Sequence, residues 1–189
     1  MITIIITAYK EAKTIGGLLE SILDPKFQNV PQEEFEILLA CPDAETLDAT
    51  LSKLDEFNFD MNYFTHVKDP KKGKPTALNL AFIKAKGNIL ILTDGDIVKF
   101  GLNSINPLIY KLRNSKNAGG VTGRPISADR KTDIFGYWGN LLSDAANDKR
   151  LKTLTNDPST NKFFVMSGYI MCIYKPEFKI PENVLADDA

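Results

Sequence analysis

The sequence predicts an α/β fold with a mostly parallel central sheet. Short runs of β-branched and aliphatic residues alternate with segments whose apolar residues recur at the helical period. The runs are only five to eight residues long, which favours strands over helices. Strands that alternate with helices form right-handed crossover units, and such units give parallel sheets covered by helices.

Residues 1–98 read as four strands and three helices. The expected strands are continuous apolar runs, as in parallel sheets that are covered on both faces. Pro25 and Gly87 mark the ends of two expected helices. In chain order we expect a strand at 1–7, a helix at 11–23, a strand at 35–41, a helix at 44–57, a strand at 62–67, a helix at 74–86 and a strand at 89–93.

The pattern becomes mixed over residues 99–189. We interpret Tyr137 and Trp138 as core residues rather than as a platform for a sugar ring. We expect the whole chain, residues 1–189, to form one domain. Its second half is expected to hold a helix at 104–113, a strand at 119–126, a long helix at 132–151, a polar turn at 157–162 and an apolar stretch at 163–174.

Composition narrows the class of protein. The chain is 43% hydrophobic and 25% charged, which is ordinary for a globular domain, and its net charge of −1 favours no nucleic-acid partner. The chain shows no signal peptide, and no apolar run approaches the roughly 20 residues of a membrane span. Cys41 and Cys172 lie in strand-like runs. We interpret them as buried thiols in a reducing compartment, which predicts a cytoplasmic location.

The most informative stretch is residues 89–96, in which an apolar run ends in Asp94-Gly95-Asp96. Open α/β sheets bind their ligands at the carboxyl ends of the strands. Two carboxylates there are costly unless a positive charge neutralises them, and a divalent cation that holds a diphosphate would do so. The alternative is an Asp-rich turn with Gly95 at positive φ.

Several motifs then follow one another in a known order. They are Thr7-Ala8-Tyr9-Lys10-Glu11, Pro42-Asp43, Gly73-Lys74-Pro75-Thr76-Ala77-Leu78-Asn79, Asp94-Gly95-Asp96, Ser167-Gly168 and Asp187-Asp188. In order and spacing the chain resembles family 2 glycosyltransferases over nearly its whole length. The resemblance implies the GT-A fold, a Rossmann-like three-layer sandwich with a mixed second half. It also implies transfer of a sugar from a nucleoside diphosphate sugar, usually with inversion and with Mn²⁺ or Mg²⁺ as cofactor.

The resemblance also assigns roles to residues. Asp96 would ligate the metal, and Asp94 would face the ribose or a metal-bound water. Asp43 would accept the imino N–H of a uracil base, so that UDP is the expected nucleotide. Asp188 would be the general base, beside Asp187 and with Ser167 and Gly168 near the donor sugar or the acceptor. The nucleotide-binding set is Thr7, Ala8, Tyr9, Glu11, Asp43, Asp69, Lys74, Asp94 and Gly95.

Each of these residues also has a structural alternative. Tyr9 could pack on the first helix, and Glu11 suits the first turn of a helix. Asp43 could be a helix N-cap, Asp69 a turn residue before Pro70, and Lys74 a solvated lysine. Ser167-Gly168 could be a β-bulge, and Asp187-Asp188 could open a helix. We interpret His66, the only histidine, as structural.

The expected acceptor is a glycan or a lipid-linked hydroxyl. In the family further helices, often interfacial or membrane-spanning, follow the acidic pair. The resemblance therefore implies that residues 99–189 form an acceptor-side half that is truncated at its C-terminus, with 1–98 as the nucleotide-binding half. Any membrane contact, at the cytoplasmic face, is expected through segments that this chain lacks.

Three other functions are alternatives. A haloacid-dehalogenase-like phosphatase would need Gly-Thr after its second Asp, and Ile97-Val98 stand here instead. A nucleotidyltransferase of related fold would need a glycine-rich segment after the first strand, which is absent. A non-catalytic nucleotide-sugar-binding module is the third, and the presence of both acidic pairs argues against it.

Overall fold

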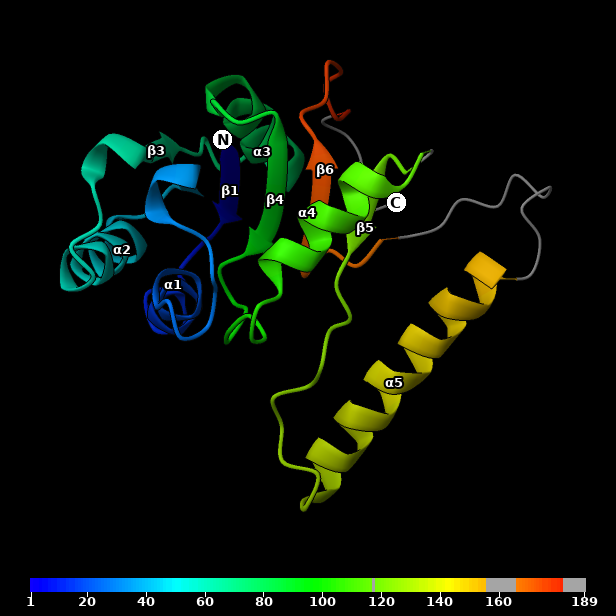
Figure 1. Ribbon diagram of the computed structural model, residues 1–189. Coiled ribbons are helices and arrows are strands. Elements are labelled where there is room, and N and C mark those ends of the chain that lie inside the picture. Colours follow the sequence, from blue (N-terminus) through cyan, green and yellow to red (C-terminus); the bar gives the residue numbers. More distant parts are fainter. Residues whose placement is uncertain (117, 156–165, 182–189) are drawn as a thin grey trace.

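The computed structural model describes residues 1–116, 118–155 and 166–181. In this part of the chain the strands are β1 (Ile2–Thr7), β2 (Phe35–Cys41), β3 (Phe64–Lys68), β4 (Ile89–Asp94), β5 (Gly120–Thr122) and β6 (Ile170–Tyr174). The helices are α1 (Ile15–Leu23), α2 (Ala44–Glu56), α3 (Lys74–Lys84), α4 (Ile105–Asn114) and α5 (Ile134–Thr155), with 3₁₀ turns at Gln32–Glu34 and Met61–Tyr63. Figure 1 shows their arrangement around one sheet.

The sheet has the strand order β3-β2-β1-β4-β6-β5. The strands β1 to β4 are parallel, whereas β6 runs antiparallel to both of its neighbours. The strand order reverses between β1 and β4, because the chain passes from β3 back to the other side of β1. Such a switch point is where open α/β sheets form their ligand crevice.

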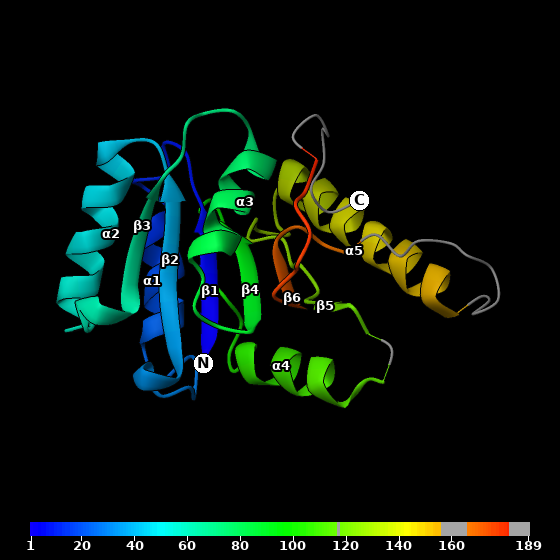
Figure 2. The same ribbon diagram turned by 90° about the horizontal axis from the view of Figure 1, so that it is seen from above.

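Helices cover both faces of the sheet. One buried cluster packs α1, α2 and α4 against one face, and a second packs α3 against the other. Figure 1 shows α3 above the strands β1 and β4 and α1 below them, and Figure 2 looks onto the face that α3 covers. The α/β three-layer fold with a mostly parallel sheet is therefore confirmed, and the mixed second half is the antiparallel pair β5–β6.

Element boundaries differ from expectation at a few places. The first helix starts at Ile15 rather than at residue 11, because residues 8–14 form a loop in which Lys10 has a φ of 62°. The expected strand at 119–126 is only three residues long. Of the apolar stretch at 163–174, only Ile170–Tyr174 is a strand. The expected turn at 157–162 lies outside the described residues.

The interpretation of Tyr137 and Trp138 as core residues is wrong. Their exposed fractions are 54% and 55%, although both belong to the long helix α5. Figure 1 shows this helix standing away from the sheet. Among the described residues, no helix is both long enough and apolar enough to cross a bilayer. Cys41 and Cys172 are both buried free thiols, as expected.

Candidate functional site

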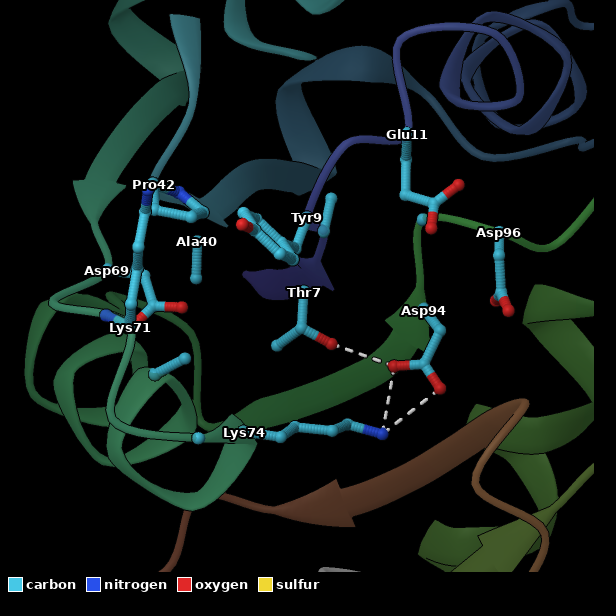
Figure 3. A pocket seen from close by; sticks show the side chains of 14 residues that line it. Thr7, Tyr9, Glu11, Ala40, Pro42, Asp69, Lys71, Lys74, Asp94 and Asp96 are labelled. Atoms are coloured by element: carbon cyan, nitrogen blue, oxygen red, sulfur yellow. Dashed lines mark hydrogen bonds and ion pairs between the residues drawn. The ribbon is translucent and has the colours of Figure 1, made fainter.

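A cavity of about 540 Å³ opens at the carboxyl ends of the parallel strands (Figure 3). The loops that follow β1, β2, β3 and β4 form its wall together with the start of α3. Of the ten residues that we expected to bind nucleotide or metal, only Asp43 is missing from this wall. The lining residues are Thr7, Ala8, Tyr9, Glu11, Ala40, Pro42, Asp69, Lys71, Gly73, Lys74, Ala77, Asp94, Gly95 and Asp96.

Asp94 is held by neighbours on two other elements. The Thr7 hydroxyl at the end of β1 donates a 2.8 Å hydrogen bond to Asp94 Oδ1. Lys74 Nζ, at the start of α3, lies 2.8 Å from Oδ1 and 3.1 Å from Oδ2 (Figure 3). A carboxylate with a lysine beside it is a suitable place for a ligand that carries both hydroxyl groups and negative charge.

Gly95 is required by close packing rather than by a left-handed backbone. Its φ is not positive, so the alternative of a turn with Gly95 at positive φ is wrong. A Cβ at this position would lie 2.6 Å from Ala8 Cβ, because the loop after β1 passes directly against it. The Thr14 hydroxyl also bonds the Gly95 carbonyl at 3.0 Å and Glu11 Oε2 at 2.8 Å. The loops after β1 and β4 therefore fix one another.

Asp96 lies at the exposed rim of the cavity. Although the residue as a whole is exposed, partial desolvation of its carboxyl group raises the pKa of Asp96, and the negative charges of Asp94 and Glu11 raise it further. Figure 3 shows the three carboxylates on one side of the cavity, from two different loops. Their mutual repulsion makes this side of the cavity a favourable position for a cation.

The residues present fit a divalent metal that is shared with a substrate. Among the described residues, no group of three His, Cys, Asp or Glu side chains could hold a metal ion without other ligands. A site for Mg²⁺ or Mn²⁺ that carries a nucleotide needs only one or two carboxylates, because phosphate oxygens and water complete the coordination. Asp94 and Asp96 supply that number.

Tyr9 covers the opposite side of the cavity. Its ring is half exposed, and the ammonium groups of Lys10 and Lys71 lie 5.2 Å and 5.5 Å from the ring centroid. The aromatic face thus carries two cations in cation–π geometry. Lys71, together with Ala40 and Ala77, is a lining residue that the sequence reasoning did not assign. Its position shortly before Gly73-Lys74 was the available signal.

Asp43 and Asp69 have structural tasks. Asp43 caps α2, since its two carboxylate oxygens accept the amides of Thr46 at 2.9 Å and Lys10 at 3.0 Å. Burial alone would raise the pKa of Asp43, but hydrogen bonds from Thr46 and Lys10 outweigh it and lower the pKa. Asp69 accepts the Lys71 amide at 2.9 Å, and it also lines the cavity.

The expected acceptor-side residues lie elsewhere or outside the described part of the chain. Ser167 is buried beside β5, where its amide donates to the Thr122 hydroxyl at 3.1 Å. Neither Ser167 nor Gly168 is among the residues that line the cavity. Asp187 and Asp188 lie outside the described residues.

Solved structures share this architecture. A mannosyltransferase from Pyrobaculum calidifontis, in complex with GDP-Man and Mn²⁺, has a TM-score of 0.63 at 21% identity, over 99% of this chain and 49% of that one. Residues 1–349 of S. aureus TarS with UDP give 0.51 at 18% identity, over 70% and 39%. Mannosyl-3-phosphoglycerate synthase from Rubrobacter xylanophilus gives 0.55 at 15% identity, over 93% and 54%.

These likenesses show the fold, which is that of GT-A glycosyltransferases. The chain spans about half of the first and third of these proteins and less of the second. A comparison with curated protein sequences gives no match. The profile described as "Glycosyl transferase family 2" matches residues 3–171, which is most of the sequence. The chain therefore belongs to glycosyl transferase family 2, as its motifs predicted.

Proposed function

We propose that the protein transfers a sugar from a nucleoside diphosphate sugar to a hydroxyl group of an acceptor, with inversion and with the help of Mn²⁺ or Mg²⁺. The observation that carries the proposal is the position of Asp94 and Asp96. They stand at the carboxyl end of β4, beside Lys74, on the wall of the cavity. Family membership and neighbours that bind GDP-Man or UDP support it.

The chemistry follows from charge. A nucleoside diphosphate is a good leaving group only where its developing negative charge is neutralised, and a bound metal ion would supply that neutralisation as a Lewis acid. Asp96 and Asp94 would hold the ion. Lys74 lies beside Asp94 and can donate to a phosphate oxygen as a point charge. Asp188 is proposed as the general base that takes the acceptor proton, a contribution of about 10²–10⁴-fold.

We propose UDP as the nucleotide, with the base next to Tyr9 and Pro42. The half-exposed Tyr9 ring, which has the ammonium groups of Lys10 and Lys71 beside it, lines the cavity together with Pro42 after the end of β2. Asp43 is proposed to accept the imino N–H of the base with a carboxylate lone pair that the two backbone amides leave open. The buried free thiols of Cys41 and Cys172 support a reducing, cytoplasmic setting.

A donor panel tests the function. UDP- and GDP-linked hexoses are incubated with the protein and Mn²⁺, and release of nucleoside diphosphate is measured with and without a mixture of glycan acceptors. We expect one donor to turn over and expect Asp188→Asn to bind it with unchanged affinity while turnover falls roughly a hundredfold or more. Binding without turnover of any donor would support a non-catalytic nucleotide-sugar-binding module instead.

A further inference from the structure

Helix α5 packs with its polar side inward. Asn140 and Asn147 have exposed fractions of 7% and 5%, and their amides donate to the carbonyls of Asp129 at 3.0 Å and Pro125 at 3.1 Å. Gly136 is buried on the same side, where a Cβ would collide with the carbonyl oxygen of Arg130. The segment 124–130 therefore lies against a small and polar helix face, which leaves the other face outward.

The outward face is apolar over the first three turns of the helix. At 100° per residue its large side chains cover an arc of about 160°. Phe135 is 86% exposed, which is the opposite of what an aromatic side chain in a folded domain normally shows. The face, here called the α5 outer face, consists of Ile134, Phe135, Tyr137, Trp138, Leu141 and Leu142, all of them exposed.

The width and composition of the α5 outer face indicate what covers it. An arc of about 160° is wider than the narrow seam through which a helix pairs with a single partner helix. Tyr and Trp side chains at half exposure, next to Phe, Ile and Leu, are the residues that helices lying in a membrane interface use. The face ends at Leu142, and the first charged residue after it on the helix is Asp144.

Charge around the helix agrees with an anionic surface. The whole chain has a net charge of −1, but residues 124–152 hold six Lys or Arg against four Asp, a local charge of +2. Asp144 is paired with Arg124 at 2.9 Å. Basic residues flank the apolar stretch on both sides, at Arg130 and Lys131 and at Lys149, Arg150 and Lys152. Basic residues placed in this way are attracted to an anionic leaflet.

We propose that the α5 outer face docks on the surface of an anionic lipid bilayer, with α5 lying in the plane of the interface. Figure 2 shows α5 on the side of the sheet where β6 and β5 lie, with its first turns toward the end to which the arrow of β2 points. The cavity lies at that end, where the parallel strands terminate. Docking would hold the cavity at the membrane. Together with the proposed transfer reaction, on which this last step rests, it selects a lipid-linked acceptor over a soluble glycan. The docking itself does not depend on that reaction.

Trp138 reports the docking directly, because it is the only tryptophan of the chain. Its emission is recorded while vesicles of phosphatidylcholine, alone or equimolar with phosphatidylglycerol, are added to the full chain. We expect a blue shift with the anionic vesicles, quenching by lipids brominated along the acyl chain, and a much weaker response to phosphatidylcholine alone. Phe135→Gln together with Leu142→Gln should weaken partitioning by roughly tenfold or more, since both substitutions remove apolar surface that the bilayer would bury.

A matched control separates docking through α5 from nonspecific adsorption of the protein to vesicles. Tyr110→Gln on α4 replaces a residue that is 70% exposed outside α5, and it should leave vesicle binding unchanged. Nucleotide binding by both variants reports that they fold. Three results would overturn the proposal: no spectral change with anionic vesicles, equal loss in the control, or a blue shift that follows protein concentration without lipid. The last result would identify a second copy of the chain as the partner.

Discussion

At the scale of single residues, the cavity gathers carboxylates that the protein neutralises only in part. Asp94 forms an ion pair with Lys74 and accepts a hydrogen bond from the Thr7 hydroxyl. Asp96 has a raised pKa, because its carboxyl group is partly desolvated and lies near the negative charges of Asp94 and Glu11. Since a carboxyl group with a raised pKa destabilises the folded state when it is ionised, Asp96 is tolerated at a cost. Residues that oppose folding in this way are typical of functional sites.

Asp43 has two candidate roles that the sequence could not distinguish, namely N-cap of α2 and acceptor for the nucleotide base. Asp43→Ala removes both the α2 cap and the proposed base contact, so we expect a loss of about 1 kcal/mol in the free energy of unfolding and a loss of preference for UDP over GDP. Asp43→Ser keeps a capping oxygen and should restore most of the stability but not the preference. Chemical denaturation and nucleotide titrations measure the two effects. Full UDP preference in both variants would show that Asp43 does not read the base.

The pH dependence of the cap has a definite sign. Because the folded-state pKa of Asp43 is lowered, its contribution to stability is present above the unfolded-state pKa of about 3.9 and is lost as pH falls through the folded value. The stability difference between wild type and Asp43→Ala should therefore be largest near neutral pH. It should shrink below about pH 4. A difference that grows on acidification would contradict the assignment.

At the scale of elements, the site depends on loops that are pressed against one another. A Cβ on Gly95 would meet the loop after β1, whereas a Cβ on Gly101, in the same connection from β4 to α4, would meet nothing within 4 Å. We expect Gly95→Ala to lower the free energy of unfolding by about 1–3 kcal/mol and to weaken nucleotide binding. Gly101→Ala is the matched control and should be neutral. Equal effects of the two changes would mean that the contact with Ala8 is not what fixes the loop.

The elements also show what periodicity can and cannot predict. Continuous apolar runs placed β1, β2 and β4 correctly, because most positions of a strand buried on both faces are apolar; Thr3, Glu36 and Thr93 are the buried polar exceptions. The interpretation of Tyr137 and Trp138 in α5 as core residues failed, because the face of α5 that packs is built from Asn140, Asn147 and Gly136. Amide side chains and a glycine carry no hydrophobic signal, so the face with which such a helix packs is known only from its tertiary contacts.

At the scale of the whole molecule, the switch in strand order between β1 and β4 brings the site together. The sequence predicted that Asp94, Asp96 and the residues after β1 share one sheet edge, since parallel strands end on the same side. It assigned no role to Lys71, Ala40 or Ala77, which line the cavity from the loop before α3, from β2 and from α3. The two alanines contribute to the cavity because their small side chains leave its volume open, and which small residues border a cavity depends on the folded structure.

The central claim is that the protein binds a nucleoside diphosphate through a divalent metal held at the end of β4. Calorimetric titration with UDP tests this claim. Wild type is titrated in the presence of Mn²⁺ and again with a chelator in place of Mn²⁺, and Asp96→Asn is titrated in the presence of Mn²⁺. Asp48→Asn, on the exposed side of α2, is the matched control. We predict metal-dependent binding in wild type and control, its loss on chelation and in Asp96→Asn, and an unfolding temperature of Asp96→Asn that is no lower than wild type. Binding of UDP by Asp96→Asn with wild-type affinity in the presence of Mn²⁺ would contradict the account.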